Sequence, residues 1–427
     1  MKLPALLAVL AGAAAAHAQP RHLFADRTNN ILWMIDDQNA SGLIDEPGEI
    51  WTYFSAANAA GTQSIDNPNC LTVRADGLAS IGDQLTTSVY LFHDLNKDGD
   101  CQDIGESVVA AGPGNASGIS LAFPTGLAFD PAGVLYVVNA GNSFGADAIY
   151  RLVDLDGDGR FQSTGEIQPY VTTGAFGATP NGPYSPQEIF FTGSPTATVG
   201  YLRNSSSGLN GVFRFVDLDH NGRADDPGEF AAYWDATGAS GVAPLAGFAL
   251  EPDNARPGSM YALQTATGGV DQIVRLTDLN HDGDAQDPGE AVLVYSNAAT
   301  GFTGIDLVSL ADGRVLITDN SGHKVFVLTD LDADDRFLSA GEQTVLFNNT
   351  LLLAGEVRPL APIARFCQAN CDESTTPPAL NVLDFSCFLN KFAAGDLYAN
   401  CDSSSTPPVL NVLDFACFLN KFAEGCP

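Results

Sequence analysis

An acidic segment recurs six times along the chain, and its carboxylates are spaced to converge on one point. In the third copy it reads Asp154-Leu-Asp156-Gly-Asp158-Gly159, and Glu166 closes it at position 13. Side chains at alternate positions gather when the chain curls, and the glycine permits a sharp turn. Two carboxylates 4 Å apart repel by about 4 kcal/mol at an effective dielectric near 20. Three or four of them together therefore need a cation.

The six copies begin 57, 60, 63, 61 and 52 residues apart and offer oxygen ligands at positions 1, 3, 5 and 13. The predicted ligands are Asp37, Asn39, Ser41, Glu49, Asp94, Asn96, Asp98, Glu106, Asp154, Asp156, Asp158, Glu166, Asp217, Asp219, Asn221, Glu229, Asp278, Asn280, Asp282, Glu290, Asp330, Asp332, Asp334 and Glu342. Because Ca²⁺ takes six to eight oxygens in flexible geometry, the cofactor predicted is Ca²⁺ in EF-hand-like loops. Metal-free turns rich in Asp, Asn and Gly are the alternative.

Two of the six copies depart from the pattern. The first has Ser41 at position 5 and so carries less charge, and the sixth has Asp335 where the turn glycine belongs. Asp tolerates the left-handed conformation better than most residues, so the sixth loop remains a candidate. We expect all six ions to have a structural role, holding the outer hairpin of each repeat.

Alternating apolar strands precede the loops, for example 149–153 and 325–329, and a short strand follows each Gly-Glu pair. The loop is therefore predicted at the tip of a β-hairpin. In the third copy two further strands, 126–130 and 134–138, come before it. Four strands in each of six repeats predict a mainly β fold, a six-bladed β-propeller over residues 19–364, with 351–363 completing the first blade. A solenoid is the alternative architecture.

Residues 365–427 form a different unit, a tandem repeat with a 30-residue period. In each copy a helix is predicted, with Phe385, Phe388, Leu389 and Phe392 on one apolar stripe in the first. Asp384 can cap the first turn of that helix. The second copy repeats the stripe at Phe415, Phe418, Leu419 and Phe422. With six of the eight cysteines in the last 61 residues, we predict a small disulfide-rich α-helical domain.

Both units resemble known families. The strand-turn-strand segments 126–138 and 317–325 loosely resemble blades of NHL and gluconolactonase-like propellers. The tail resembles GC-type dockerin domains through its doubled loop-helix motif and Gly425-Cys426, although its loops are three residues longer and less acidic. That resemblance implies a cohesin-like or other anchoring protein as partner, contacted through Val382, Leu383, Val412 and Leu413. It also implies Ca²⁺ at Asp372, Asn381, Asp384, Asp402, Asn411 and Asp414.

Disulfides are the alternative means of fastening the tail. Pairs Cys371–Cys387 and Cys401–Cys417 would tie each loop to its own helix, and Cys367–Cys426 would join the ends. Six cysteines permit fifteen connectivities, so this pairing is a hypothesis. Cys70–Cys101 is the candidate pair in the second repeat.

The start of the chain predicts export. Met1-Lys2, an apolar run over 3–16 and Ala16-His17-Ala18 have the pattern of a signal peptide, residues 1–18, cleaved before Gln19. We therefore expect a secreted or cell-surface protein. No later apolar run is long enough for a membrane span. A net charge of −32 with only 19 Lys and Arg argues against a nucleic-acid partner.

Two functions remain open. The first is a calcium-binding propeller that binds a glycan or protein and is anchored by its tail. The second is a carbohydrate-active hydrolase or lactonase with its site in the propeller channel. Asn142, Asp319 and Asn320 lie where gluconolactonase-like enzymes place channel ligands, although they are also ordinary turn residues. Carboxylates converging in the channel would favour the enzyme.

Overall fold

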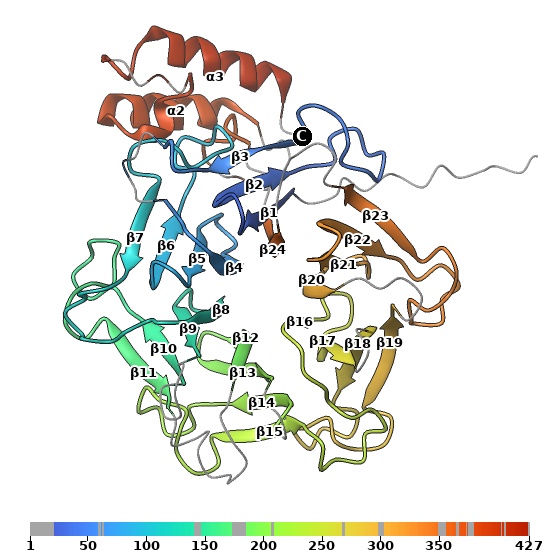
Figure 1. Ribbon diagram of the computed structural model, residues 1–427. Helices are drawn as coiled ribbons and strands as arrows, with labels where there is room; N and C mark the ends of the chain where they lie inside the picture. Colours follow the sequence, from blue (N-terminus) through green and yellow to red (C-terminus); the bar gives the residue numbers. More distant parts are fainter. Residues whose placement is uncertain are drawn as a thin grey trace, which may run out of the picture.

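Six four-stranded antiparallel sheets are arranged in a ring, and a small helical tail follows them (Figure 1). This six-bladed β-propeller confirms the predicted fold class. The computed structural model describes residues 21–427 apart from 59–60, 62–63, 141–146, 173–184, 206–208, 267–269, 298–302, 349–355, 364–366, 373, 375–379, 403, 405–406 and 426–427. The predicted signal peptide, Asn142 and Cys426 lie outside the described residues.

Each blade runs from an inner strand beside the central axis to an outer strand at the perimeter (Figure 1). Blade 1 contains β24 (Val357–Ile363), β1 (Arg21–Asp26), β2 (Ile31–Ile35) and β3 (Ile50–Phe54). Blade 2 contains β4 (Pro68–Val73), β5 (Ala79–Asp83), β6 (Ser88–Phe92) and β7 (Ser107–Ala111). Blade 3 contains β8 (Pro124–Phe129), β9 (Leu135–Asn139), β10 (Ala148–Leu152) and β11 (Ile167–Val171).

The other three blades repeat this order. Blade 4 contains β12 (Pro186–Ser194), β13 (Ala197–Asn204), β14 (Gly211–Phe215) and β15 (Phe230–Trp234). Blade 5 contains β16 (Leu250–Pro252), β17 (Ser259–Ala266), β18 (Val270–Thr277) and β19 (Ala291–Ser296). Blade 6 contains β20 (Gly304–Ser309), β21 (Val315–Asp319), β22 (Lys324–Leu328) and β23 (Gln343–Asn348).

The ring closes through strands from the two ends of the propeller. β24 pairs antiparallel with β1, with Arg21 opposite Ile363 and Leu23 opposite Ala361. The missing strand of the first blade is therefore supplied by residues 357–363 of the predicted segment 351–363; residues 351–355 lie outside the described part of the chain. A solenoid would leave the terminal repeats apart, so the ring excludes that alternative.

The apolar cores lie between neighbouring blades. Phe54 of blade 1 packs on Phe92 of blade 2, with ring centroids 4.7 Å apart. Similarly, Phe24 of blade 1 packs on Phe347 of blade 6 at 5.6 Å. A blade is covered on both faces, which explains why strands such as β9 and β21 are buried at every residue.

The tail contains α2 (Val382–Ala394), a 3-10 turn η1 (Leu397–Ala399) and α3 (Val412–Glu424). Phe388 and Phe418 stack at its centre, with ring centroids 4.2 Å apart. The predicted pairs Cys371–Cys387 and Cys401–Cys417 are confirmed. Cys367 is also disulfide-bonded. Among the described helices, none is long and apolar enough to cross a membrane.

Two sequence predictions about packing are wrong. Leu389 and Leu419 do not join the apolar core and are exposed, because the buried face of each helix is turned toward its cysteine and its capping Asp. Cys70 and Cys101 are free and buried. Cys70 lies on the inner strand β4, whereas Cys101 lies in the loop between the outer strands β6 and β7. Strands are about 4.8 Å apart, so these two cysteines are beyond the reach of a disulfide.

Candidate metal centre

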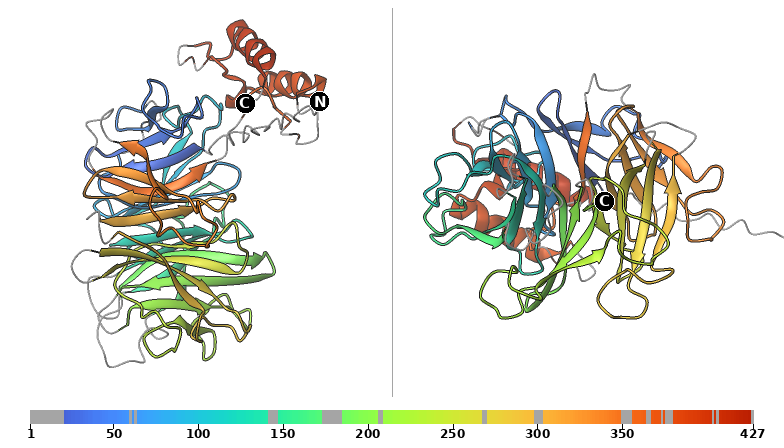
Figure 2. Two further views of the ribbon diagram at one scale, coloured as in Figure 1. Left: turned by 90° about the vertical axis from the view of Figure 1, so that its right-hand side faces the viewer. Right: turned by 60° about the horizontal axis from the view of Figure 1, so that its bottom comes forward.

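All six acidic segments join the third strand of a blade to its outer strand, as predicted. We call them loops 1 to 6: residues 37–49, 94–106, 154–166, 217–229, 278–290 and 330–342. They lie toward the perimeter of the ring, where β2 leads to β3 and β6 to β7 (Figures 1 and 2). Because the six loops occupy the same place in their blades, we expect them to have the same conformation.

The six loops share one backbone conformation. Position 4 is left-handed in each, with φ between 54° and 79°, at Ala40, Lys97, Gly157, His220, His281 and Ala333. Position 6 is left-handed too, and this includes Asp335 (φ 63°), whose carboxylate is paired with Arg256. The glycine at position 12 has φ between 84° and 96° in all copies. The two histidines at position 4, His220 and His281, are therefore exposed turn residues.

The aspartate at position 1 organises the turn. In loop 2, Asp94 accepts the backbone amides of Asp98 (3.1 Å) and Gly99 (2.9 Å). Asp154 accepts those of Gly157 (2.7 Å) and Gly159 (2.9 Å) in loop 3. These amides hold the first carboxylate toward the centre of the loop, where positions 3 and 5 also lie.

The glutamate at position 13 reaches across the hairpin in loops 2 to 6, whereas among the described residues Glu49 of loop 1 accepts only the nearby amides of Asp45 and Glu46. Glu166 accepts the amide of Leu155 through Oε1 (3.0 Å) and that of Ser163 through Oε2 (2.7 Å). The six glutamates are all buried. A carboxylate oxygen has a second lone pair, so these bonds leave room for a cation. The glutamate therefore fastens the loop whether or not it binds an ion.

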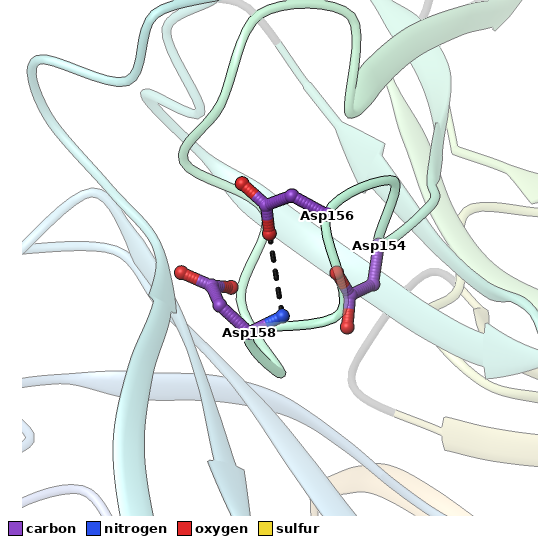
Figure 3. Close-up of side chains that lie close together, drawn as sticks. All are labelled: Asp154, Asp156 and Asp158. Carbon is purple, nitrogen blue, oxygen red and sulfur yellow. Dashed lines mark hydrogen bonds between the residues drawn. The ribbon is translucent and has the colours of Figure 1, made fainter.

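Three loops bring three carboxylates to one point. The ligand oxygens of Asp154, Asp156 and Asp158 lie within 4.8 Å of one another, and Figure 3 shows the three side chains around one turn. The same holds for Asp217, Asp219 and Glu229 in loop 4, and for Asp330, Asp332 and Asp334 in loop 6. These oxygen-only donor sets fit a hard cation such as Ca²⁺. The sixth loop, which departs from the sequence pattern, is among the converging ones.

Loops 2 and 5 use an asparagine at position 3. The Asn96 amide nitrogen donates to Asp98 (3.1 Å) and to Asp103 (2.9 Å). Asn280 makes the equivalent contacts with Asp282 and Asp287. The amide thus offsets carboxylate repulsion in these loops. In loop 1, Ser41 accepts and donates backbone hydrogen bonds, and its position 1 residue Asp37 is buried.

Position 10 was missed by the sequence analysis. Its side chain hydrogen-bonds a predicted ligand in loops 2 to 6, as Ser163 does with Asp156 (2.8 Å) and Ser339 with Asp332. The residues are Glu46, Asp103, Ser163, Asp226, Asp287 and Ser339. Aligning the six copies would have shown that a short polar or acidic residue recurs there.

Position 8 links each loop to the preceding blade. Its amide donates to a carbonyl of that blade's outer region, as Cys101 does to Tyr53 (2.8 Å) and Phe161 to Ala110 (2.7 Å). Ile44 of loop 1 donates to Leu346 of β23 (2.7 Å), which joins blade 1 to blade 6. Ala224, Ala285 and Phe337 repeat the pattern. The loops therefore fasten neighbouring blades as well as their own hairpins.

Loop 2 has an unusual environment because the tail covers it. Gln368, which is 4% exposed, donates a side-chain hydrogen bond to the Asn96 carbonyl. Burial, with repulsion from Asp98, raises the pKa of Asp94 to about 7. Burial and the nearby Asp94 raise the pKa of Glu106 to about 8. A bound cation would offset this repulsion and compete with the protons.

The predicted ligands of the tail have capping roles. Asn381 accepts the amide of Leu383, while Asp384 accepts those of Asn381 and Asp372. Asn411, Asp414 and Asp402 repeat these contacts at α3. In the described part of the tail no three carboxylates converge as they do in loops 3, 4 and 6.

Three carboxyl groups occupy inner strands of neighbouring blades. They are Glu188 on β12, Glu251 on β16 and Asp306 on β20. Burial, then repulsion from Asp306 and Glu251, raises the pKa of Glu188 well above its usual range. Burial likewise raises the pKa of Asp306 to about 6. The sequence signal was an acidic residue early in an inner strand, where apolar residues predominate.

Of the channel residues proposed from the sequence, Asp319 makes local contacts, whereas the Asn320 Oδ1 is buried without a hydrogen-bond partner in the described part of the chain. Asp319 accepts the amides of Thr303 (3.1 Å) and Ser321 (3.0 Å), so it fastens the turn after β21. Asp306 is held by the amides of Leu307 (2.8 Å) and of Leu360 on β24 (2.7 Å). Of the channel carboxylates, Asp306 is thus fixed in place across the junction of blades 6 and 1.

No protein-family model and no curated protein sequence matches the chain. Several solved structures are similar to it. Virginiamycin B lyase from Staphylococcus aureus is 17% identical, with 71% of this chain and 75% of that one covered and a TM-score of 0.39. A putative 6-phosphogluconolactonase from Bacteroides fragilis is 12% identical, covering 81% and 98%, with a TM-score of 0.44. A PQQ-bound aldose sugar dehydrogenase from Streptomyces coelicolor is 13% identical, covering 73% and 87%, with a TM-score of 0.45.

Proposed function

We propose that this protein is an exported, calcium-binding β-propeller that binds a glycan or a protein and is attached to an extracellular or cell-surface assembly by its tail. The observation that carries the proposal is the repeated rim loop. Six copies share one backbone conformation, and loops 3, 4 and 6 bring three carboxylates within 4.8 Å. Their oxygen donors suit Ca²⁺, and the position 8 contacts make each ion a fastener between blades.

The calcium proposal is tested on the purified protein. Titration calorimetry and elemental analysis after removal of weakly bound metal should find calcium bound. The variant Asp156→Asn, which removes one charge from loop 3, should lose affinity at one class of sites. Asp312→Asn, at an exposed position in the turn between β20 and β21 and outside the six loops, is the matched control. Absence of bound calcium in the parent protein would reject the proposal.

Anchoring rests on two exposed apolar pairs at the starts of the tail helices. Val382 and Leu383 begin α2, while Val412 and Leu413 begin α3, and all four are more than half exposed. Such paired apolar surfaces are costly in water and suit a partner protein. The resemblance of the tail to dockerins suggests a cohesin-like partner. The confirmed loop-to-helix disulfides would keep the two surfaces rigid.

The anchoring proposal predicts redundancy between the two helices. In a binding assay against a panel of cohesin modules, Leu383→Asp or Leu413→Asp alone should retain binding through the other surface. The double variant should lose it. Leu389→Asp, also at an exposed leucine of α2, is the control. Retention of full binding by the double variant would contradict the proposed surface.

The channel carboxylates favour a second candidate, a hydrolase or lactonase acting on sugars. Carboxyl groups with raised pKa values in a recess can serve as general acids. Here Glu188 is the first choice, because burial and two neighbouring acids favour its protonated form. A screen of lactones and polysaccharides should show turnover that Glu188→Gln abolishes. Turnover that persists in this variant would exclude Glu188 as the acid.

A further inference from the structure

A cleft of about 520 Å³ separates the tail from blades 1 and 2. Three cationic side chains line it: Arg21 at the start of β1, Lys97 in loop 2 and Lys421 in α3. The packing of blade 1 on blade 2 places Arg21 and Lys97 on one side of the cleft, and the docking of the tail adds Lys421. Among the described residues lining the cleft, Asp98 is the one carboxylate. Even with Asp36, the ion-pair partner of Arg21, counted beside Asp98, cationic side chains outnumber carboxylates at the cleft, in a protein whose formal charge is −32.

Contacts with neighbouring side chains and carbonyls hold the residues that line the cleft in place. The Arg21 guanidinium lies 5.4 Å from the Trp51 ring centroid, and its Nε donates to Asp36 at 3.0 Å. Trp51 donates through Nε1 to the Gly99 carbonyl at 2.8 Å. Lys421 donates to the side chain of Gln368, which itself donates to loop 2. The walls are thus largely preformed, as in small-molecule sites.

We propose that this cleft binds an anionic saccharide, a sugar that carries a carboxylate or a sulfate ester. The cationic side chains would attract the charge, and the exposed amide of Gln38 suits a hydroxyl group. The Trp51 indole adds an apolar wall for the sugar ring. An ion in loop 2 would offset the charge of Asp98 and make the cleft more positive. This inference rests on the proposal that the protein binds a glycan. It adds that the glycan is anionic and that it binds in this cleft.

The test uses the full-length protein and three probes: trigalacturonate, a sulfated carrageenan oligosaccharide and neutral galactotriose. Calorimetry is run in calcium-free buffer and again with added calcium. We expect the anionic probes to bind more tightly than the neutral one, with an affinity that falls as ionic strength rises. The more tightly bound anionic probe shows whether the charge is a carboxylate or a sulfate.

The tail repeat supplies a matched control. Lys391 occupies in α2 the position that Lys421 occupies in α3, but it lies over the Tyr398 ring at 4.3 Å and does not line the cleft. Lys97→Gln and Lys421→Gln should each weaken binding on the order of fivefold. The double variant should weaken it further, and Lys391→Gln should bind like the parent. Lys97→Gln leaves the Lys421–Gln368 contact intact, so it separates charge from tail docking.

The proposal is overturned if no anionic probe binds in either buffer, if the neutral probe binds equally well, or if the double variant binds like the parent. These outcomes are distinct from a failure of the calcium proposal, which elemental analysis decides without any sugar.

Discussion

Loops 2 and 3 have nearly the same motif and different surroundings. In loop 3 the carboxylates of Asp154, Asp156 and Asp158 are exposed and lie close together. In loop 2 Asp94 is buried, and Gln368 from the tail covers the loop. Both loops have the same left-handed positions and the same contact to the preceding blade. The motif thus determines the path of the backbone. The neighbouring segment that covers a loop determines how much it costs to keep the carboxylates of that loop ionised.

Removal of divalent cations should have the largest effect. Each loop held at 100 times its dissociation constant gains about 2.7 kcal/mol of stability from the ion, and six loops multiply the effect. We expect EGTA to lower the melting temperature strongly and calcium to restore it. Hydrogen exchange should show loops 2 and 3 both loosening. A melting temperature unchanged by EGTA would mean that a metal ion stabilises neither loop 2 nor loop 3.

Position 8 distinguishes the two loops by side-chain size. Phe161→Ala in loop 3 should lower the free energy of unfolding by about 3–4 kcal/mol, because it empties a buried aromatic site between blades 2 and 3. Cys101→Ala in loop 2 should cost only about 1 kcal/mol, since little volume is lost. Denaturant unfolding of the two variants measures the difference. A loss for Phe161→Ala as small as that for Cys101→Ala would mean that the ring contributes little, leaving the backbone contact that both variants keep.

Gln368→Ala removes the cover from loop 2 alone. It leaves the Asn96 carbonyl without its buried donor, which should cost about 1–3 kcal/mol. Amide exchange should increase in loop 2 and stay the same in loop 3. Gln38→Ala, at an exposed position in loop 1, should change neither. Faster exchange in both loops would show that the tail stabilises the whole ring.

Glu188 shows whether a carboxyl group outside the acidic loops also has a raised pKa. Burial raises the pKa of Glu188 well above its usual range, so the folded protein keeps a proton that the unfolded chain releases above about pH 4.3. The parent is therefore expected to lose stability as pH rises from 4 toward that raised value. Glu188→Gln stays neutral and should avoid this loss.

Melting curves from pH 4 to 8 should show an advantage of Glu188→Gln over the parent that grows as the pH rises. Glu46→Gln, at an exposed position, should follow the parent. An advantage that stays constant with pH would mean that Glu188 has the same pKa in the folded and the unfolded protein, which contradicts a rise in its pKa on burial.

Local and repeated features were predictable from the sequence. The six acidic loops fell at hairpin tips, because these depend on short-range pattern and turn chemistry. Residues 357–363 of the predicted segment 351–363 closed the ring, because the first repeat lacked a strand. The pairs Cys371–Cys387 and Cys401–Cys417 followed from the loop-helix repeat. The predicted pair Cys70–Cys101 was wrong. The two cysteines are in one repeat, but they lie toward opposite edges of its sheet, Cys70 on β4 and Cys101 between β6 and β7. Three carboxylates also converge in the sixth loop, although its sequence departs from the pattern at Asp335.

By itself, then, the sequence determined the strands, the number of blades and the oxygen donors of each loop, because these depend on residues close together in the chain. Only the tertiary structure decided which charges meet. It brought Glu188, Glu251 and Asp306 to neighbouring inner strands, and it placed Gln368 over loop 2. It also gathered Arg21, Lys97 and Lys421 around one cleft. Such encounters depend on ring closure and tail docking, which join segments hundreds of residues apart through packing that no local pattern encodes.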